Sequence, residues 1–127
     1  MQVIARAAAL AAMLAVTSPA FADRSITGAE AQRMLAGKAF LMHCVDGTSG
    51  RGVFTHGVVH VSYRRAGAFE VAQAESDRAT VRAQGNEICM NWTQFGGGGD
   101  ACYPVSERAV GQYRIGGLGR WCDINAR

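Results

Sequence analysis

The sequence lacks the short motifs that mark the common catalytic and phosphate-binding sites. It contains no Gly-x-Ser-x-Gly and no His-Glu-x-x-His, which excludes the usual signatures of serine hydrolases and zinc proteases. A phosphate-binding loop needs a helix directly after its glycines, or a Gly-Lys-Ser/Thr ending. Neither follows the three glycine-rich stretches at 47–52, 96–99 and 116–119, so we interpret these stretches as turns.

Paired carboxylates would be another route to hydrolysis. The spacing of the acidic residues predicts no acid and base pair, although a pairing in space stays open among Asp46, Glu87, Asp100 and Asp123. We therefore predict that the protein is not an enzyme and uses no cofactor. A hydrolase with dispersed carboxylates is the last of three alternatives for its function.

The charge pattern lacks a one-sided excess. The chain has 13 Lys and Arg residues against 10 Asp and Glu residues, a formal net charge of +3, and the two signs are interspersed. Binding of nucleic acid needs basic residues gathered on one face. We therefore predict no nucleic-acid partner.

A long apolar stretch occurs only near the first residue. Arg6 precedes an apolar segment at 7–16, and Ala20-Phe21-Ala22 has the small residues of a signal-peptidase site. A membrane-spanning helix needs about 20 apolar residues, and this shorter stretch is interrupted by Thr17-Ser18-Pro19. We predict a signal peptide at 1–22, a single mature domain at 23–127 with no membrane span, and a periplasmic or secreted location.

The four cysteines all follow the predicted cleavage site. An even number of cysteines in a small exported domain is typical of disulfides rather than of a zinc site. Three pairings are possible. We favour Cys89–Cys102, which would join the strands on either side of the glycine loop at 96–99, and Cys44–Cys122, which would join the first strand to the last.

One helix is expected, at 25–37. Thr27 is a suitable N-cap, Glu30 three residues later completes a capping box, and Gly37 is a C-terminal stop. After Lys38 the pattern changes to short segments separated by glycine-bearing turns, which is typical of antiparallel strands. The predicted strands are 38–45, 53–64, 68–72, 80–83, 87–93, 101–105, 111–115 and 119–124.

These elements predict a mostly β fold, a small antiparallel barrel or sandwich of about eight strands with one N-terminal helix. Alternation is clearest in the segment 53–64, whose core face is expected to hold Val53, Thr55, Gly57, Val59, Val61 and Tyr63. The segment 87–93 also alternates, with Ile88, Met90 and Trp92 expected on one face.

Aromatic and arginine residues gather in the last third of the chain. Such residues, when exposed, recognise proteins or glycans; packing into the core at alternate strand positions is the other interpretation. The candidate binding surface consists of Trp92, Tyr113, Arg114, Arg120 and Trp121.

Three histidines and two methionines suggest an envelope metal site, which we consider and set aside. His56 and His60 would share one face of the predicted strand, but four residues of strand span about 13 Å. That distance is too long for one ion. We expect solvent-facing histidines, His43 included, and no bound metal.

The mature region resembles the DUF995-like group of small periplasmic proteins of unknown function from alphaproteobacteria. The resemblance lies in the stretches 26–30, 35–38, 87–92, 102–105 and 112–115. It implies a compact β fold in the cell envelope and supplies neither an activity nor site residues. Periplasmic lysozyme inhibitors are similar in size, disulfide use and β architecture.

The leading hypothesis is a monomeric, non-enzymatic binding or inhibitor module for an envelope or extracellular protein or glycan. The alternative is a carrier that holds a small molecule or a metal in the interior of the barrel. A barrel of eight strands has room for one small ligand. An apolar cavity would favour the carrier, and a filled interior with an exposed aromatic and arginine patch would favour the binding module.

Overall fold

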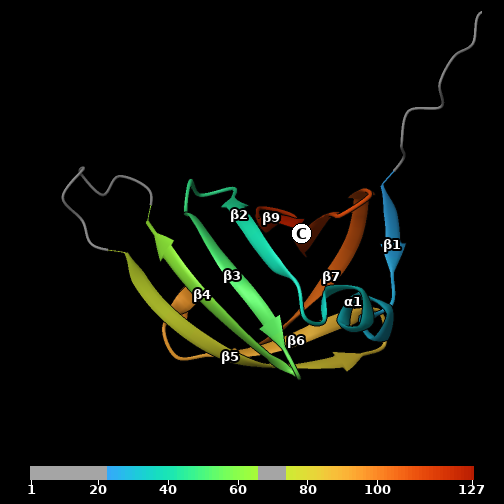
Figure 1. Cartoon of the computed structure of the whole chain (residues 1–127), viewed down its shortest axis with the longest axis horizontal. Helices are drawn as coiled ribbons and strands as arrows, with labels where there is room; N and C mark the ends of the chain where they lie inside the picture. Colours follow the sequence, from blue (N-terminus) through green and yellow to red (C-terminus); the bar gives the residue numbers. More distant parts are fainter. Residues whose placement is uncertain (1–22, 66–73) are drawn as a thin grey trace, which may run out of the picture.

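Eight antiparallel strands close into a barrel in the computed structural model, which describes residues 23–65 and 74–127 (Figure 1). Each barrel strand pairs with the next along the chain, and β9 pairs with β2 to close the ring. The expected fold class is confirmed. The barrel strands are β2 (Ala39–Cys44), β3 (Ser49–Thr55), β4 (Val58–Arg64), β5 (Glu75–Gln84), β6 (Glu87–Trp92), β7 (Gly99–Ala109), β8 (Gln112–Gly117) and β9 (Arg120–Ala126).

The predicted signal peptide at 1–22 and the predicted strand at 68–72 lie outside the described residues. Within them, the sequence placed most strands correctly but gave shorter bounds for β5 and β7 than the structure has. The structure has a further short strand, β1 (Arg24–Ile26), and two of its residues, Ser25 and Ile26, had been assigned to the start of the helix. It pairs with the second half of β7, where Ile26 faces Val105.

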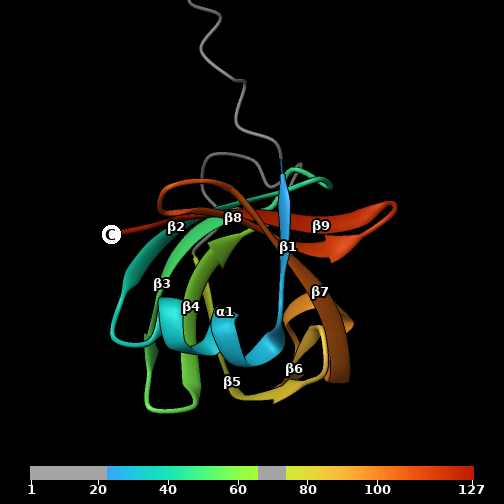
Figure 2. The same ribbon diagram turned by 90° about the vertical axis from the view of Figure 1, so that its right-hand side faces the viewer.

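The helix α1 (Gly28–Leu35) covers one end of the barrel. In Figure 2 the strands surround it, and it packs against β5, β6 and β7. The Thr27 hydroxyl accepts a hydrogen bond from the Glu30 amide at 3.1 Å, as an N-cap does. The Glu30 carboxylate does not return to Thr27; it accepts from Arg24 at 3.2 Å instead, which fastens the helix to β1.

The predicted strand at 53–64 is wrong, because the chain reverses in its middle. His56 and Gly57 have positive φ angles of 31° and 75° and form the two-residue turn of the β3–β4 hairpin. The turn resets the alternation. Val59, Val61 and Tyr63 face the interior as expected, but in β3 the buried side chain is Phe54, while Thr55 is exposed.

Two glycines of β3 allow a close approach of their neighbours. A Cβ atom added at Gly52 would overlap the ring of Phe40 and the carbonyl oxygen of His60. One added at Gly50 would overlap the backbone of Ser62 and Tyr63. Because these positions lack side chains, the ring of Phe40 can lie close to the barrel wall.

The end of the barrel beneath α1 is filled. Ala31 and Leu35 of the helix are 0% and 1% exposed and belong to one apolar cluster with side chains from the surrounding strands. Burial of the Leu35 side chain contributes about 1.5–3 kcal/mol to folding. The same cluster contains Ile26, Val81, Ile88 and Val105.

Candidate functional site

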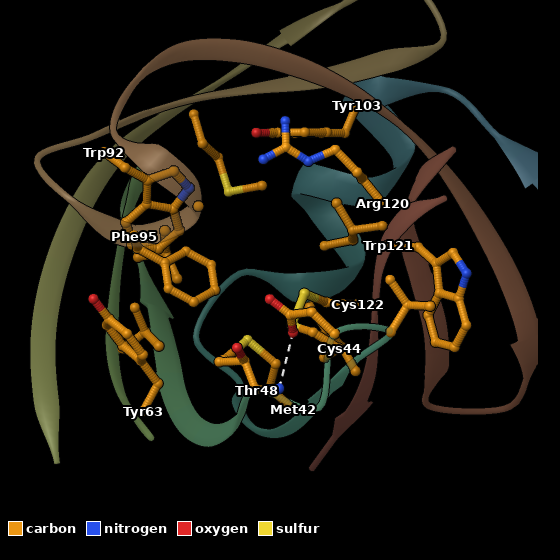
Figure 3. A pocket seen from close by; sticks show the side chains of 18 of the residues that line it. Met42, Cys44, Thr48, Tyr63, Trp92, Phe95, Tyr103, Arg120, Trp121 and Cys122 are labelled. Atoms are coloured by element: carbon orange, nitrogen blue, oxygen red, sulfur yellow. Dashed lines mark hydrogen bonds between the residues drawn. A yellow bond between two sulfur atoms is a disulfide. The ribbon is translucent and has the colours of Figure 1, made fainter. Parts of the chain in front are cut away.

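The other half of the barrel holds a cavity of about 630 Å³ (Figure 3). Ligand sites in proteins usually have volumes of about 300–1,000 Å³. Loop residues from β2–β3, β6–β7 and β8–β9 line it and α1 contributes none, so its rim lies at the end opposite the helix. The deeper lining is apolar: Phe40, Met42, Phe54, Val59, Val61, Met90, Trp92, Ile115 and Ile124.

An aromatic group forms one wall of the cavity. The ring of Phe95 lies between those of Trp92 and Tyr63, with centroid distances of 4.8 and 4.7 Å and edge-on geometry. Phe95 belongs to η1 (Phe95–Gly97), a short turn of 3₁₀ helix in the loop between β6 and β7. Trp92 and Phe95 are near neighbours in the sequence, whereas Tyr63 belongs to β4, and the fold brings it against Phe95.

Asp77 of β5 fastens this loop. Its Oδ2 accepts hydrogen bonds from the backbone amides of Gln94 and Phe95, both at 2.8 Å. Burial of Asp77 acts to raise its pKa, but the donated amide hydrogen bonds, first that of Phe95, outweigh burial and the pKa is lowered. The ionised carboxylate therefore holds Phe95 in place against the cavity.

Tyr63 contributes its ring to the cavity but not its hydroxyl. The hydroxyl oxygen is buried and has no hydrogen-bonding partner among the described residues, and Figure 3 shows it directed away from the middle of the pocket. Arg65 lies at the rim and forms an ion pair with Glu75. Glu75 Oε2 lies 2.8 Å from Arg65 Nε.

Polar side chains occupy the rim on the side of β7, β9 and the β2–β3 loop. Arg120, Tyr103, Asp46 and Thr48 all line the cavity. Thr48 is 6% exposed, and its amide donates to Asp46 Oδ1 at 2.9 Å. This bond is the main reason that the pKa of Asp46 is lowered. The cavity is therefore apolar in its depth and polar along one side of its rim.

The candidate binding surface predicted from the sequence does not form as one patch. Trp92 and Tyr113 are 7% and 3% exposed, so their assignment to a surface is wrong. Both lie at interior positions of the alternating strands β6 and β8, which favours packing over recognition. Trp92 lines the cavity, and so do Arg120 and Trp121.

Arg114 and Trp121, also assigned to that surface, do lie together. The guanidinium carbon of Arg114 is 3.6 Å from the centroid of the Trp121 ring, a cation–π contact. The same guanidinium forms two hydrogen bonds to Asp123, at 2.7 and 3.0 Å. This cluster is half-buried and its polar groups are already paired with each other.

Both predicted disulfides are confirmed. Cys44 and Cys122 are cross-strand partners of β2 and β9, and Cys89 and Cys102 are cross-strand partners of β6 and β7. Two disulfides are compatible with an oxidising, exported location. None of the helices in the described ranges is long and apolar enough to cross a membrane.

His43, His56 and His60 are all exposed, as expected. His56 and His60 do not share a strand, however, because His56 lies in the β3–β4 turn and His60 lies on β4. Within residues 23–65 and 74–127, no three His, Cys, Asp or Glu side chains are grouped so that they could hold a metal ion.

Comparison of the chain with protein-family models, with curated proteins and with solved structures found no match. The resemblance to the DUF995-like proteins thus stays a prediction.

Proposed function

We propose that the protein is a non-enzymatic binding protein of the cell envelope that holds a small, largely apolar organic molecule inside its barrel. The observation that carries this proposal is the cavity of about 630 Å³ with its apolar lining. An interior filled by side chains would have favoured recognition at the outer surface. Removal of apolar ligand surface from water, at about 25 cal/mol per Å², supplies the driving force for binding in such a cavity.

The structure gives less support to a binding or inhibitor module that uses the aromatic and arginine surface, because two of its five residues are buried. The lining of the cavity is mostly hydrocarbon, which favours an organic ligand over a metal ion. With the predicted signal peptide and the two disulfides, the proposed setting is the periplasm or the extracellular space, where a monomer would bind and carry or sequester its ligand.

The test is a titration of the purified, oxidised protein with N-phenyl-1-naphthylamine, a neutral dye that fluoresces in apolar surroundings. We expect a saturable increase in fluorescence with one dye bound per chain. Val61→Trp should abolish it, because Val61 is 4% exposed and points into the cavity. Circular dichroism would establish that the barrel still folds.

Ser62→Trp is the matched control. Ser62 is the next residue of β4, and alternation places it on the outer face. We expect the dye to bind this variant as it binds the unchanged protein. A folded Val61→Trp variant with full dye binding, or a wild-type protein that binds no dye, would contradict the proposed function.

A further inference from the structure

Arg120 is the first residue of β9, and the strand register places its side chain on the inner face of the barrel. Two and four residues further along, Cys122 and Ile124 line the cavity, so Arg120 shares their face. Arg120 is itself exposed and lies at the rim. A cation at this position overlooks a cavity whose deeper lining is apolar.

The charge of Arg120 is not neutralised by an ion pair with the described part of the chain. None of the seven ion pairs found there includes it, so no described carboxylate lies within 4.0 Å of its guanidinium. The other arginine of the rim, Arg65, is paired with Glu75. Asp46 is near Arg120, but its carboxylate is held by Thr48.

Tyr103 supplies a second donor on the same side. In Figure 3 the side chains of Tyr103 and Arg120 extend from the same wall over the pocket, and both line the cavity. The residue opposite Arg120 on β8 is Gly117, which has no side chain. The glycine leaves the space above this part of β8 open, so a ligand group can reach both side chains.

We propose that the ligand is an amphipathic carboxylic acid whose apolar body fills the cavity and whose carboxylate is bound at the rim by Arg120 and Tyr103. A guanidinium presents N–H donors in a fork that matches the two oxygens of a carboxylate. A hydroxyl donor beside it completes the site. This inference rests on the proposed function and adds the chemical class of the ligand.

The ion pairs at the rim favour a ligand with one negative charge. Arg65 is paired with Glu75, whereas Arg120 lies near Asp46 without forming an ion pair with it. Arg120 is therefore the rim guanidinium that a ligand can bind, and one guanidinium matches one negative charge. A phosphate dianion would find no second unpaired cation among the described lining residues.

The test measures how amphiphiles of one chain length displace N-phenyl-1-naphthylamine from the wild-type protein at neutral pH, below their micellar concentrations. The set is dodecanoate, dodecanol, dodecyl phosphate and dodecyltrimethylammonium. We expect dodecanoate to displace the dye at about a tenfold lower concentration than dodecanol, the ratio that a charged hydrogen bond produces. Dodecyl phosphate should not exceed dodecanoate, and the cation should bind most weakly.

Variants assign the preference to its residues. Arg120→Gln should bring dodecanoate down to the affinity of dodecanol measured in the same variant, and Tyr103→Phe should remove part of the preference. Arg120→Lys keeps the charge without the fork and should be intermediate. Arg82→Gln is the control, because Arg82 pairs with Asp100 and does not line the cavity.

The outcomes separate the two proposals. If the dye and dodecanol bind but dodecanoate has no advantage, or keeps its advantage in Arg120→Gln, the assignment of a carboxylate is wrong and the binding function stands. Stronger binding of dodecyl phosphate would also overturn it. If neither the dye nor any of the chains binds, both proposals fail.

Discussion

Cys44 and Cys122 are cross-strand partners in the pairing of β2 with β9, and their disulfide covalently joins the first and last strands of the barrel. The two cysteines are 78 residues apart in the sequence. The second disulfide, Cys89–Cys102, spans only 13 residues and joins strands that a loop already connects. The two bonds therefore constrain the unfolded chain to different extents.

We predict that removing the Cys44–Cys122 bond by a double change to alanine lowers the free energy of unfolding by about 4 kcal/mol, against about 3 kcal/mol for Cys89–Cys102. The difference follows from the larger loop that the first bond closes. Urea unfolding of both variants under oxidising conditions measures it. A larger loss of unfolding free energy for the Cys89–Cys102 variant would contradict this prediction. It would mean that the packing of the fully buried Cys89, rather than loop closure, decides which disulfide stabilises more.

We predict that Gly52→Ala is destabilising by about 1–3 kcal/mol, the usual range for overpacking. The new methyl group would overlap the ring of Phe40 and the carbonyl oxygen of His60, and the barrel wall is not free to move. Gly117→Ala is the control, because a Cβ there meets nothing within 4 Å. Thermal unfolding of the two variants should separate them; equal melting temperatures would contradict the packing of Phe40 on β3.

The parts of the fold that were predictable depend on local signals. Thr27 and Gly37 mark the ends of the helix, and both features are present in the structure. The glycine run after β6 indicated a hairpin loop, and a hairpin places Cys89 within reach of Cys102. Each of these inferences needs only residues that are close in the sequence.

The turn at His56-Gly57 was not predicted, because the alternation of Val59, Val61 and Tyr63 was extended back through Gly57. The adjacent apolar pairs Val53-Phe54 and Val58-Val59 in fact break the alternation on either side of the turn. Gly57 was the one residue typical of a turn, and His56 is not a usual turn residue at positive φ. Missing the turn shifted the expected face of β3 by one residue. Phe54, which lines the cavity, was consequently assigned to the outside.

The cavity itself has no local signal. Its lining comes from strands throughout the barrel, and whether their side chains meet in the middle depends on the circumference of the closed sheet. Arg120 was identified as a candidate, but on an outer surface. Its true side follows from the alternation along β9, where it shares the face of Cys122 and Ile124.

We predict that Asp77→Ala loosens the wall of the cavity at Phe95. The amides of Gln94 and Phe95 lose their acceptor, and a hydrogen bond to a charged group contributes about 1.5–3 kcal/mol where water does not compete. Amide hydrogen exchange at 94–98 should accelerate, and the affinity for N-phenyl-1-naphthylamine should fall. Ser76→Ala is the control, because only the backbone carbonyl of Ser76 bonds to Gln94. Unchanged exchange in Asp77→Ala would show that Phe95 is held by packing alone.

The last prediction concerns the pH dependence of stability at Asp123. Its carboxylate accepts hydrogen bonds from Arg114 at 2.7 and 3.0 Å and from Arg108 at 3.1 Å. The hydrogen bond from Arg114 is the main cause that lowers the pKa of Asp123 below its ordinary value of 3.8. A carboxyl with a lowered pKa in the folded state stabilises the protein above its ordinary pKa, and this stabilisation is lost as the pH falls through the folded-state value.

Asp123→Asn should therefore be less stable than the unchanged protein at pH 7, and the difference should disappear in acid, at about pH 2. We expect a difference of about 1 kcal/mol at pH 7, because the side chain is 35% exposed and solvent screens the pair. Asp100→Asn is the control, since the Asp100 pair with Arg82 is about half exposed and should change stability less. Urea unfolding at a series of pH values gives the comparison. A deficit in Asp123→Asn that stays constant from pH 7 to acid would mean that the side chain acts through packing, because a loss caused by the missing charge must vanish once the carboxyl is protonated.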